Sequence, residues 1–238
     1  MKYFFLLFAA FALVFISCKE EKTTPKVIYD KQSSIDKTVK ADTSSIKIAD
    51  LPVQISGTNY LIHPIGDVRL YDDYRKVYGS SKTNNISYAI SNYNENELTG
   101  YFSNLIFQHK DSLTYKSLTN NNIQIQTVTY LPQIAQKAKK QMLVYQLVDA
   151  DTNKDGKLDQ NDIKSLYISQ IDGGNFIKLT QELFELIDWN IIESQNRLYF
   201  RSLEDTNKNG AFDKDDKVHY QYINLESKDL KTETYLPY

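Results

Sequence analysis

The sequence predicts an all-β protein built from antiparallel hairpins, and three observations lead to this prediction. The chain of 238 residues contains 18 Tyr and 11 Phe, residue types that are enriched in strands. Its apolar and polar residues alternate in short runs, as they do in strands with one buried face. An acidic, asparagine-rich loop occurs twice, each time between two such runs. Two short helices are also expected, at 67–79 and 180–187.

The N-terminus combines an apolar stretch with the only cysteine of the chain. Residues 1–17 place Lys2 before a stretch that is shorter than the ~20 residues of a membrane-spanning helix. Ser17 then precedes Cys18. This arrangement resembles a bacterial lipoprotein signal, which is cut before the cysteine so that the thiol can be acylated. The resemblance implies a signal peptide at 1–17 and a membrane anchor at Cys18; an ordinary secretory signal is the alternative.

The residues after Cys18 predict location and spacing. Lys19, Glu20 and Glu21 resemble the surface-export signal of some Gram-negative lipoproteins. We therefore expect a lipid-anchored outer-membrane protein exposed at the cell surface, with a periplasmic-facing protein as the alternative. Residues 18–50 are rich in Lys, Thr, Ser and Asp, which predicts a flexible tether. The folded domain is then expected at 51–238.

A repeat of about 53–54 residues runs through this domain. The segment 165–180, SLYISQIDGGNFIKLT, resembles a blade segment of TolB-type β-propellers. The segment 104–119 aligns with it, and 218–236 is a looser third copy. Strands are expected before these copies at 85–93, 141–150 and 197–204. The resemblance implies propeller-like or stacked-hairpin sheets with about three repeats, and the alternative is a β-sandwich.

The two similar loops, DTNKDGKLDQND at 151–162 and DTNKNGAFDKDD at 205–216, fit the twelve-residue calcium loop of EF-hands. That loop places oxygen ligands at positions 1, 3, 5, 7, 9 and 12, with glycine at position 6 for a sharp turn. The predicted ligands of the first loop are Asp151, Asn153, Asp155, the carbonyl of Lys157, Asp159 and Asp162. Those of the second loop are Asp205, Asn207, Asn209, the carbonyl of Ala211, Asp213 and Asp216.

The ligand types and the flanks indicate what the two Ca²⁺ ions would do. Ca²⁺ takes roughly six to eight hard oxygen ligands, and clustered carboxylates need such a cation. Both loops end in Asp and resemble the loops of dockerins and related extracellular modules. The flanks predict strands, so we expect the ions to clip long hairpin connections and not to open a pair of helices. The first loop carries more carboxylates than the second, which predicts tighter binding there.

Composition and motifs limit the classes of function. The 30 acidic and 28 basic residues leave no basic excess for a nucleic-acid partner. The sequence contains no Gly-x-Ser-x-Gly elbow and no phosphate-binding glycine loop. We therefore expect a non-enzymatic, calcium-stabilised binding module with an unknown protein or glycan partner. The alternatives are a carbohydrate-binding component of a surface polymer-uptake system, which a row of exposed aromatic residues would favour, or a hydrolase.

Overall fold

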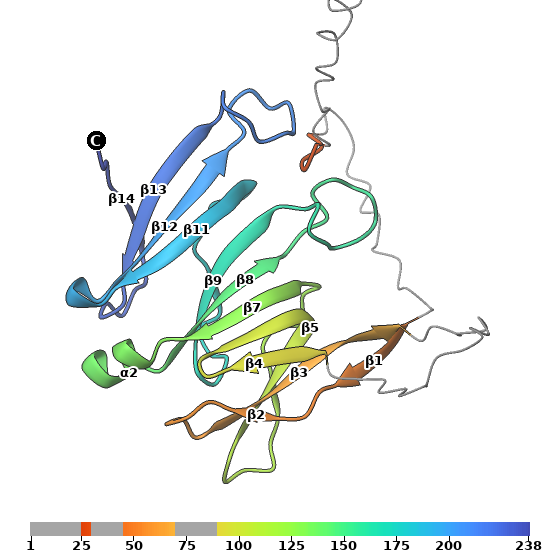
Figure 1. Ribbon diagram of the computed structural model, residues 1–238, viewed down its shortest axis with the longest axis vertical. Helices are drawn as coiled ribbons and strands as arrows, with labels where there is room; N and C mark the ends of the chain where they lie inside the picture. Colours follow the sequence, from red (N-terminus) through yellow and green to blue (C-terminus); the bar gives the residue numbers. More distant parts are fainter. Residues whose placement is uncertain (1–24, 30–44, 70–89) are drawn as a thin grey trace, which may run out of the picture.

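The computed structural model describes residues 25–29, 45–69 and 90–238, which form two open antiparallel sheets (Figure 1). The all-β prediction is confirmed. The larger sheet contains ten strands: β1 (Ser45–Ala49), β2 (Val53–Gln54), β3 (Tyr60–Arg69), β4 (Ser91–Asn94), β5 (Glu97–His109), β6 (Lys116–Ser117), β7 (Gln124–Tyr130), β8 (Met142–Val148), β9 (Lys164–Gln170) and β10 (Ile177–Lys178). The smaller sheet contains β11 (Phe184–Ile192), β12 (Arg197–Glu204), β13 (Lys217–Asn224) and β14 (Thr232–Thr234).

The larger sheet follows the order β1-β3-β5-β7-β8-β9-β10, with β2 on β3 and both β4 and β6 on β5. Strand β5 is long enough to pair with β4 and β7 near its start and with β3 and β6 near its end. Gly100 lies where the register of β5 with β7 shifts, and a Cβ there would collide with the carbonyl of Ile90. The described helices are one short α-helix, α2 (Pro132–Ala138), and a 3₁₀ turn, η2 (Glu193–Gln195).

Two hydrophobic clusters lie on opposite faces of the larger sheet, and β8 contributes to both. Leu143, Tyr145 and Leu147 point into the first cluster, which β2, β3, β5 and β7 complete. Met142 and Val144 point into the second, which lies between β8, β9 and the inner face of the smaller sheet. Strand β8 is therefore buried on both faces, and β11 of the smaller sheet lies alongside β9 (Figure 1).

The same arrangement of strands occurs twice along the chain. Strands β7-β8-β9-β10 form one antiparallel meander and β11-β12-β13-β14 form another. Each predicted calcium loop connects the second strand of its meander to the third. A related hairpin links β5 to β6, where Leu118 donates to the carbonyl of Leu105 at 2.9 Å; the bond from Leu179 to Leu166 in β9-β10 is its counterpart at 2.8 Å.

The two helix predictions fare differently. The helix predicted at 180–187 is wrong: residues 180–183 form a bend and a turn, and Phe184–Ile192 forms strand β11, which pairs with β12 with one register shift between Leu186 and Asp188. A short apolar run fits either periodicity, and the neighbouring strand supplies the backbone partners that decide. At 67–79, residues 67–69 end β3, and the remainder lies outside the described residues. So do residues 85–89 of the strand predicted at 85–93.

We expect Leu143→Ala to lower the free energy of unfolding by about 2–5 kcal/mol, because Leu143 is fully buried and truncation leaves a cavity. The matched control is Leu113→Ala, since Leu113 is 90% exposed and its truncation should change stability by less than about 0.5 kcal/mol. Urea unfolding of both variants measures the difference. Equal midpoints would show that Leu143 is not packed into the first cluster as described.

Candidate functional site

The two predicted calcium loops lie at the same end of the molecule, although they belong to different sheets (Figure 1). Loop one (151–162) connects β8 to β9, and loop two (205–216) connects β12 to β13. The N-terminal segment Pro25–Tyr29, which we call the strap, lies between them (Figure 1). The strands predicted to flank both loops are confirmed.

Loop one is held by its own acidic side chains. The carboxylate of Asp151 accepts hydrogen bonds from the backbone N–H groups of Asp155 at 3.1 Å and Gly156 at 2.8 Å. The carboxylate of Asp162 accepts from the N–H of Thr152 at 2.8 Å and so closes the loop from its other end. The side chains at positions 1 and 12 of the predicted motif therefore hold the turn from its two ends.

Loop two repeats this pattern at positions 54 residues further along. Asp205 accepts from the N–H groups of Asn209 at 3.1 Å and Gly210 at 2.7 Å. Asp216 accepts from the N–H of Thr206 at 3.1 Å. The same positions of the two loops thus make the same hydrogen bonds.

The backbone of the two loops also agrees. Position 4 has a positive φ in both loops, 59° at Lys154 and 56° at Lys208. Position 6 does so as well, with 85° at Gly156 and 84° at Gly210. Glycine is the residue that adopts such angles without strain, which explains its presence at position 6 of each loop.

All twelve predicted ligand residues lie in these two turns, and calcium binding stays a prediction. Among the described residues, the structure contains no group of three or more His, Cys, Asp or Glu side chains arranged to hold a metal ion. The carboxylates instead accept backbone N–H groups. EF-hand ligands also include amide and backbone oxygens, which in loop two come from Asn207, Asn209 and Ala211.

Two of the loop carboxylates, Asp162 and Asp205, are buried. The side chains of Asp162 and Asp205 are 1% and 4% exposed. Burial raises the pKa of Asp162 above its usual range, while backbone hydrogen bonds from Asp159, Asn153 and Thr152 act in the opposite direction. A buried carboxylate is costly without a countercharge, so a cation in the loop would stabilise the ionised form.

The strap forms hydrogen bonds with both loops. The N–H groups of Lys26 and Val27 donate to the carbonyl of Gly210 in loop two at 2.7 and 3.1 Å. The N–H of Ile28 donates to the carbonyl of Thr152 in loop one at 2.9 Å, and the Thr152 hydroxyl donates to the Lys26 carbonyl at 2.7 Å. Val27 is 4% exposed. The strap lies within the predicted tether, and sequence reasoning missed its contacts with the loops.

Two side chains of the strap strengthen this connection. The Lys26 ammonium lies 2.9 Å from a carboxylate oxygen of Glu185 on β11, whose other oxygen accepts the N–H of Lys164 on β9 at 2.9 Å. The hydroxyl of Tyr29 bonds to Asp205, and burial together with this bond raises the pKa of Tyr29 to about 12. No short sequence motif reports these contacts, because they join residues far apart in the chain.

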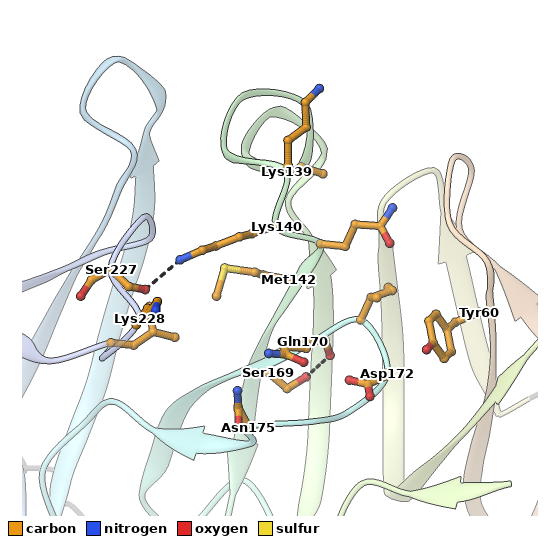
Figure 2. A pocket seen from close by; sticks show the side chains of 14 residues that line it. Tyr60, Lys139, Lys140, Met142, Ser169, Gln170, Asp172, Asn175, Ser227 and Lys228 are labelled. Carbon is orange, nitrogen blue, oxygen red and sulfur yellow. Dashed lines mark hydrogen bonds between the residues drawn. The ribbon is translucent and has the colours of Figure 1, made fainter.

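A pocket of about 760 Å³ opens between the two sheets near α2 (Figure 2). Met142, Ile171 and Leu230 contribute apolar surface, and Lys139 and Lys228 stand at its margin. The ammonium of a third lysine, Lys140, donates to three successive backbone carbonyls in the β13-β14 connection, at 3.2, 2.6 and 2.8 Å. Lys140 therefore ties the two sheets together at the edge of the pocket.

Two polar side chains of this pocket, those of Ser169 and Asp172, have hydrogen-bond or ion-pair partners in the protein. The hydroxyl of Ser169 lies 2.7 Å from the hydroxyl of Tyr145 and 2.7 Å from the carbonyl of Gln170. Asp172 pairs with Lys116 at 3.2 Å. The residues that line the pocket include neither His nor Cys.

No family model, curated protein or solved structure gives a significant match to this chain. Within the described part of the chain, no helix is both long and apolar enough to cross a membrane. The functional proposal is therefore based on the sequence and on the structure of the fold and the loops.

The two loop glycines provide a matched test of the strap. We expect Gly210→Ala to destabilise the protein by at least about 1 kcal/mol more than Gly156→Ala. Only the new Cβ at position 210 would collide with the carbonyl of Val27. The collision would disturb the hydrogen bond from the N–H of Val27 to the carbonyl of Gly210. Both variants share the cost of an alanine at positive φ, about 1–2 kcal/mol. Urea unfolding measures the difference, and trypsin should cut faster after Lys26 only in Gly210→Ala. Equal stabilities and equal cleavage rates of the two variants would contradict the contact between Gly210 and Val27.

Proposed function

We propose that this protein is a calcium-binding, lipid-anchored, non-enzymatic binding module in which Ca²⁺ stabilises the β-domain. One observation carries the proposal: two loops, 54 residues apart, share one conformation and one hydrogen-bond pattern and present oxygen-bearing residues at the EF-hand positions. Two unrelated surface turns are not expected to share these hydrogen bonds and backbone angles at positions 1, 4, 5, 6 and 12.

The energetics of the loops support a cation. Each loop is a long connection between two strands, and its backbone must be ordered at a cost in entropy. Asp162 and Asp205 are buried, and the cation would compensate their charge. Binding to the folded state alone would then stabilise that state in proportion to the logarithm of the calcium concentration.

The repeated architecture supports a structural role for the ions. In our proposal, the two meanders are blade-like units of a propeller-like arrangement, with the β5-β6 hairpin as part of a third. The loop between the second and third strands is then the same element in each calcium-binding unit. The strap would hold these two elements in one relative position through its bonds to Gly210 and Thr152.

The proposed lipid anchor at Cys18 and the proposed cellular location are based on the sequence alone. Residues 1–24, which include the proposed signal peptide and Cys18, lie outside the described residues. We propose that acylated Cys18 holds the chain in the outer membrane with the domain at the cell surface, and that a periplasmic-facing domain is the alternative. Calcium would be available at either position at the concentrations that weak extracellular sites require.

The residues that line the pocket near α2 favour a binding role over hydrolysis. Asp172 is the one carboxylate among the residues that line it, and its partner is Lys116. Glycoside hydrolysis ordinarily uses two carboxylates that flank the scissile bond. The loops, where the other clustered acids lie, are assigned to calcium in this proposal.

Calorimetric titration with Ca²⁺ tests the metal sites. We expect two sites with dissociation constants on the order of 10⁻⁴–10⁻³ M, the loop-one site being the tighter. Asp151→Ala should remove the tighter site and Asp205→Ala the weaker one. At a calcium concentration about a hundred times the dissociation constant, each site should add ~2.7 kcal/mol to the free energy of unfolding.

The control for this titration is Asp111→Ala. Asp111 is an exposed carboxylate that pairs with Lys110 in a turn outside both loops, so its removal should leave both sites intact. Identical heats from wild type, Asp151→Ala and Asp205→Ala would overturn the assignment of calcium to the loops.

We expect Cys18→Ala to release the protein from membranes. Acyl chains contribute ~0.8 kcal/mol for each buried CH₂ group, so their loss should move the chain from the detergent phase to the aqueous phase in Triton X-114 partitioning. Expression of the full-length chain in a Gram-negative host followed by this partitioning makes the measurement. A wild-type chain found in the aqueous phase would contradict the anchor.

A further inference from the structure

The outer face of the smaller sheet carries a lattice of tyrosines and paired charged residues. The alternate residues of its strands point toward the second hydrophobic cluster, and the remaining ones point to solvent. Strand register arranges these outward residues in two rows: Asp188, Arg201, Tyr220 and Tyr235 in the first, and Asn190, Tyr199, Tyr222 and Glu233 in the second. We call this surface the tyrosine face.

The rings of the tyrosine face support one another. Tyr235 stands edge-on to Tyr199 at a centroid distance of 5.2 Å and to Tyr220 at 5.8 Å. Tyr199 lies 5.4 Å from Tyr222. Such contacts stabilise the rings in place, so a ligand would meet a surface that is already ordered.

The polar groups between the rings are also fixed. Arg201 forms a two-pronged ion pair with Asp188 across β11 and β12, and this pair holds the pKa of Asp188 below its usual range. The hydroxyl of Tyr222 donates to Glu233 at 2.6 Å. The guanidinium of Arg197 lies over the ring of Tyr222, 4.3 Å from its centroid. The charges of the face therefore largely compensate one another.

A hollow of about 340 Å³ on this surface is lined by residues of β11 and β12 and by Tyr235. Tyr199 and Tyr235 contribute aromatic walls, and Asp188, Asn190 and Arg201 contribute hydrogen-bonding groups. Its volume lies near the lower end of the roughly 300–1,000 Å³ range of small-molecule sites. A few fixed polar groups beside apolar rings are what such sites use to orient a ligand.

These properties match one chemical class of ligand. A sugar ring offers a face of C–H groups that can lie on the negative face of an aromatic ring, and hydroxyls at its edge that both donate and accept. Carboxylates such as Asp188 and the amide of Asn190 accept from hydroxyls, and Arg201 donates to them. Because the face has compensated charges, a neutral ligand fits it better than an anionic or cationic one.

We propose that the tyrosine face binds neutral oligosaccharides, with the ring of one sugar seated in the hollow beside the paired rings of Tyr199 and Tyr235. This inference rests on the proposed binding function and names its ligand class and its surface. Tyr199 and Tyr235 belong to neither hydrophobic cluster, so packing of the core does not explain their presence on this face.

The test uses the full-length chain in detergent with excess calcium. Calorimetry against cello-, xylo-, laminari-, manno- and malto-hexaose should give saturable binding of at least one, and galacturonan hexamer should bind no better than that neutral sugar. We expect Tyr235→Ala to raise its dissociation constant at least about tenfold. Tyr235→Phe should retain most of the affinity, because it keeps the ring.

The matched control is Tyr101→Ala, since Tyr101 is an exposed tyrosine, 64% accessible, on β5 of the other sheet. Its removal should leave sugar binding unchanged. Circular dichroism and urea midpoints for Tyr235→Ala show whether the variant is folded, and Asn190→Ala provides a second change in the hollow that leaves every ring in place. We expect Asn190→Ala to weaken binding as well.

Several results would overturn the inference. These are no binding of any neutral hexasaccharide by the folded wild-type chain up to millimolar concentrations, an equal loss in Tyr101→Ala, or a dimer in sedimentation velocity that Tyr235→Ala dissociates. Sugar binding without any calcium heat would overturn the calcium proposal and leave this one standing. Calcium binding without sugar binding would overturn this inference and leave the calcium proposal standing.

Discussion

The structure depends on one constraint: β8 must bury side chains on both of its faces. Leu143 and Tyr145 complete the cluster inside the larger sheet, while Met142 and Val144 meet the smaller sheet. Because hydrophobic burial is roughly proportional to the apolar area removed from water, neither sheet satisfies its apolar residues alone. The packing of the second meander on the first follows from this, and it brings the two loops to the same end of the molecule.

Because the two loops lie at the same end of the molecule, both contact the strap. The strap donates to the carbonyl of Gly210 in one loop and to that of Thr152 in the other, so a change in either loop reaches the same five residues. Lys26 adds an ion pair with Glu185, which in turn bonds the start of β9. The connection between the N-terminal strap and the domain is thus made at the loops, and calcium there would stabilise both.

The tyrosine face lies on the side of the smaller sheet that is turned away from the clusters. Inward residues such as Leu198 and Phe200 hold the sheet in place, and the residues between them are free to serve another purpose. Arg201 and Asp188 compensate each other there, and Tyr235 covers the rings of β12 and β13. A rigid surface of this kind needs no movement of the loops in order to bind, so the two proposed roles are physically separate.

The sequence by itself determined the all-β class, the strands on either side of both loops and the turns in between. Alternation of apolar residues reports one buried face, and the positions of Asp, Asn and Gly report a turn. Tertiary structure alone decided the rest. Phe184–Ile192 became a strand because β12 offered backbone partners. The strap and the tyrosine face exist only because residues far apart in the chain are brought together, and contacts of that kind leave no local periodicity in a sequence.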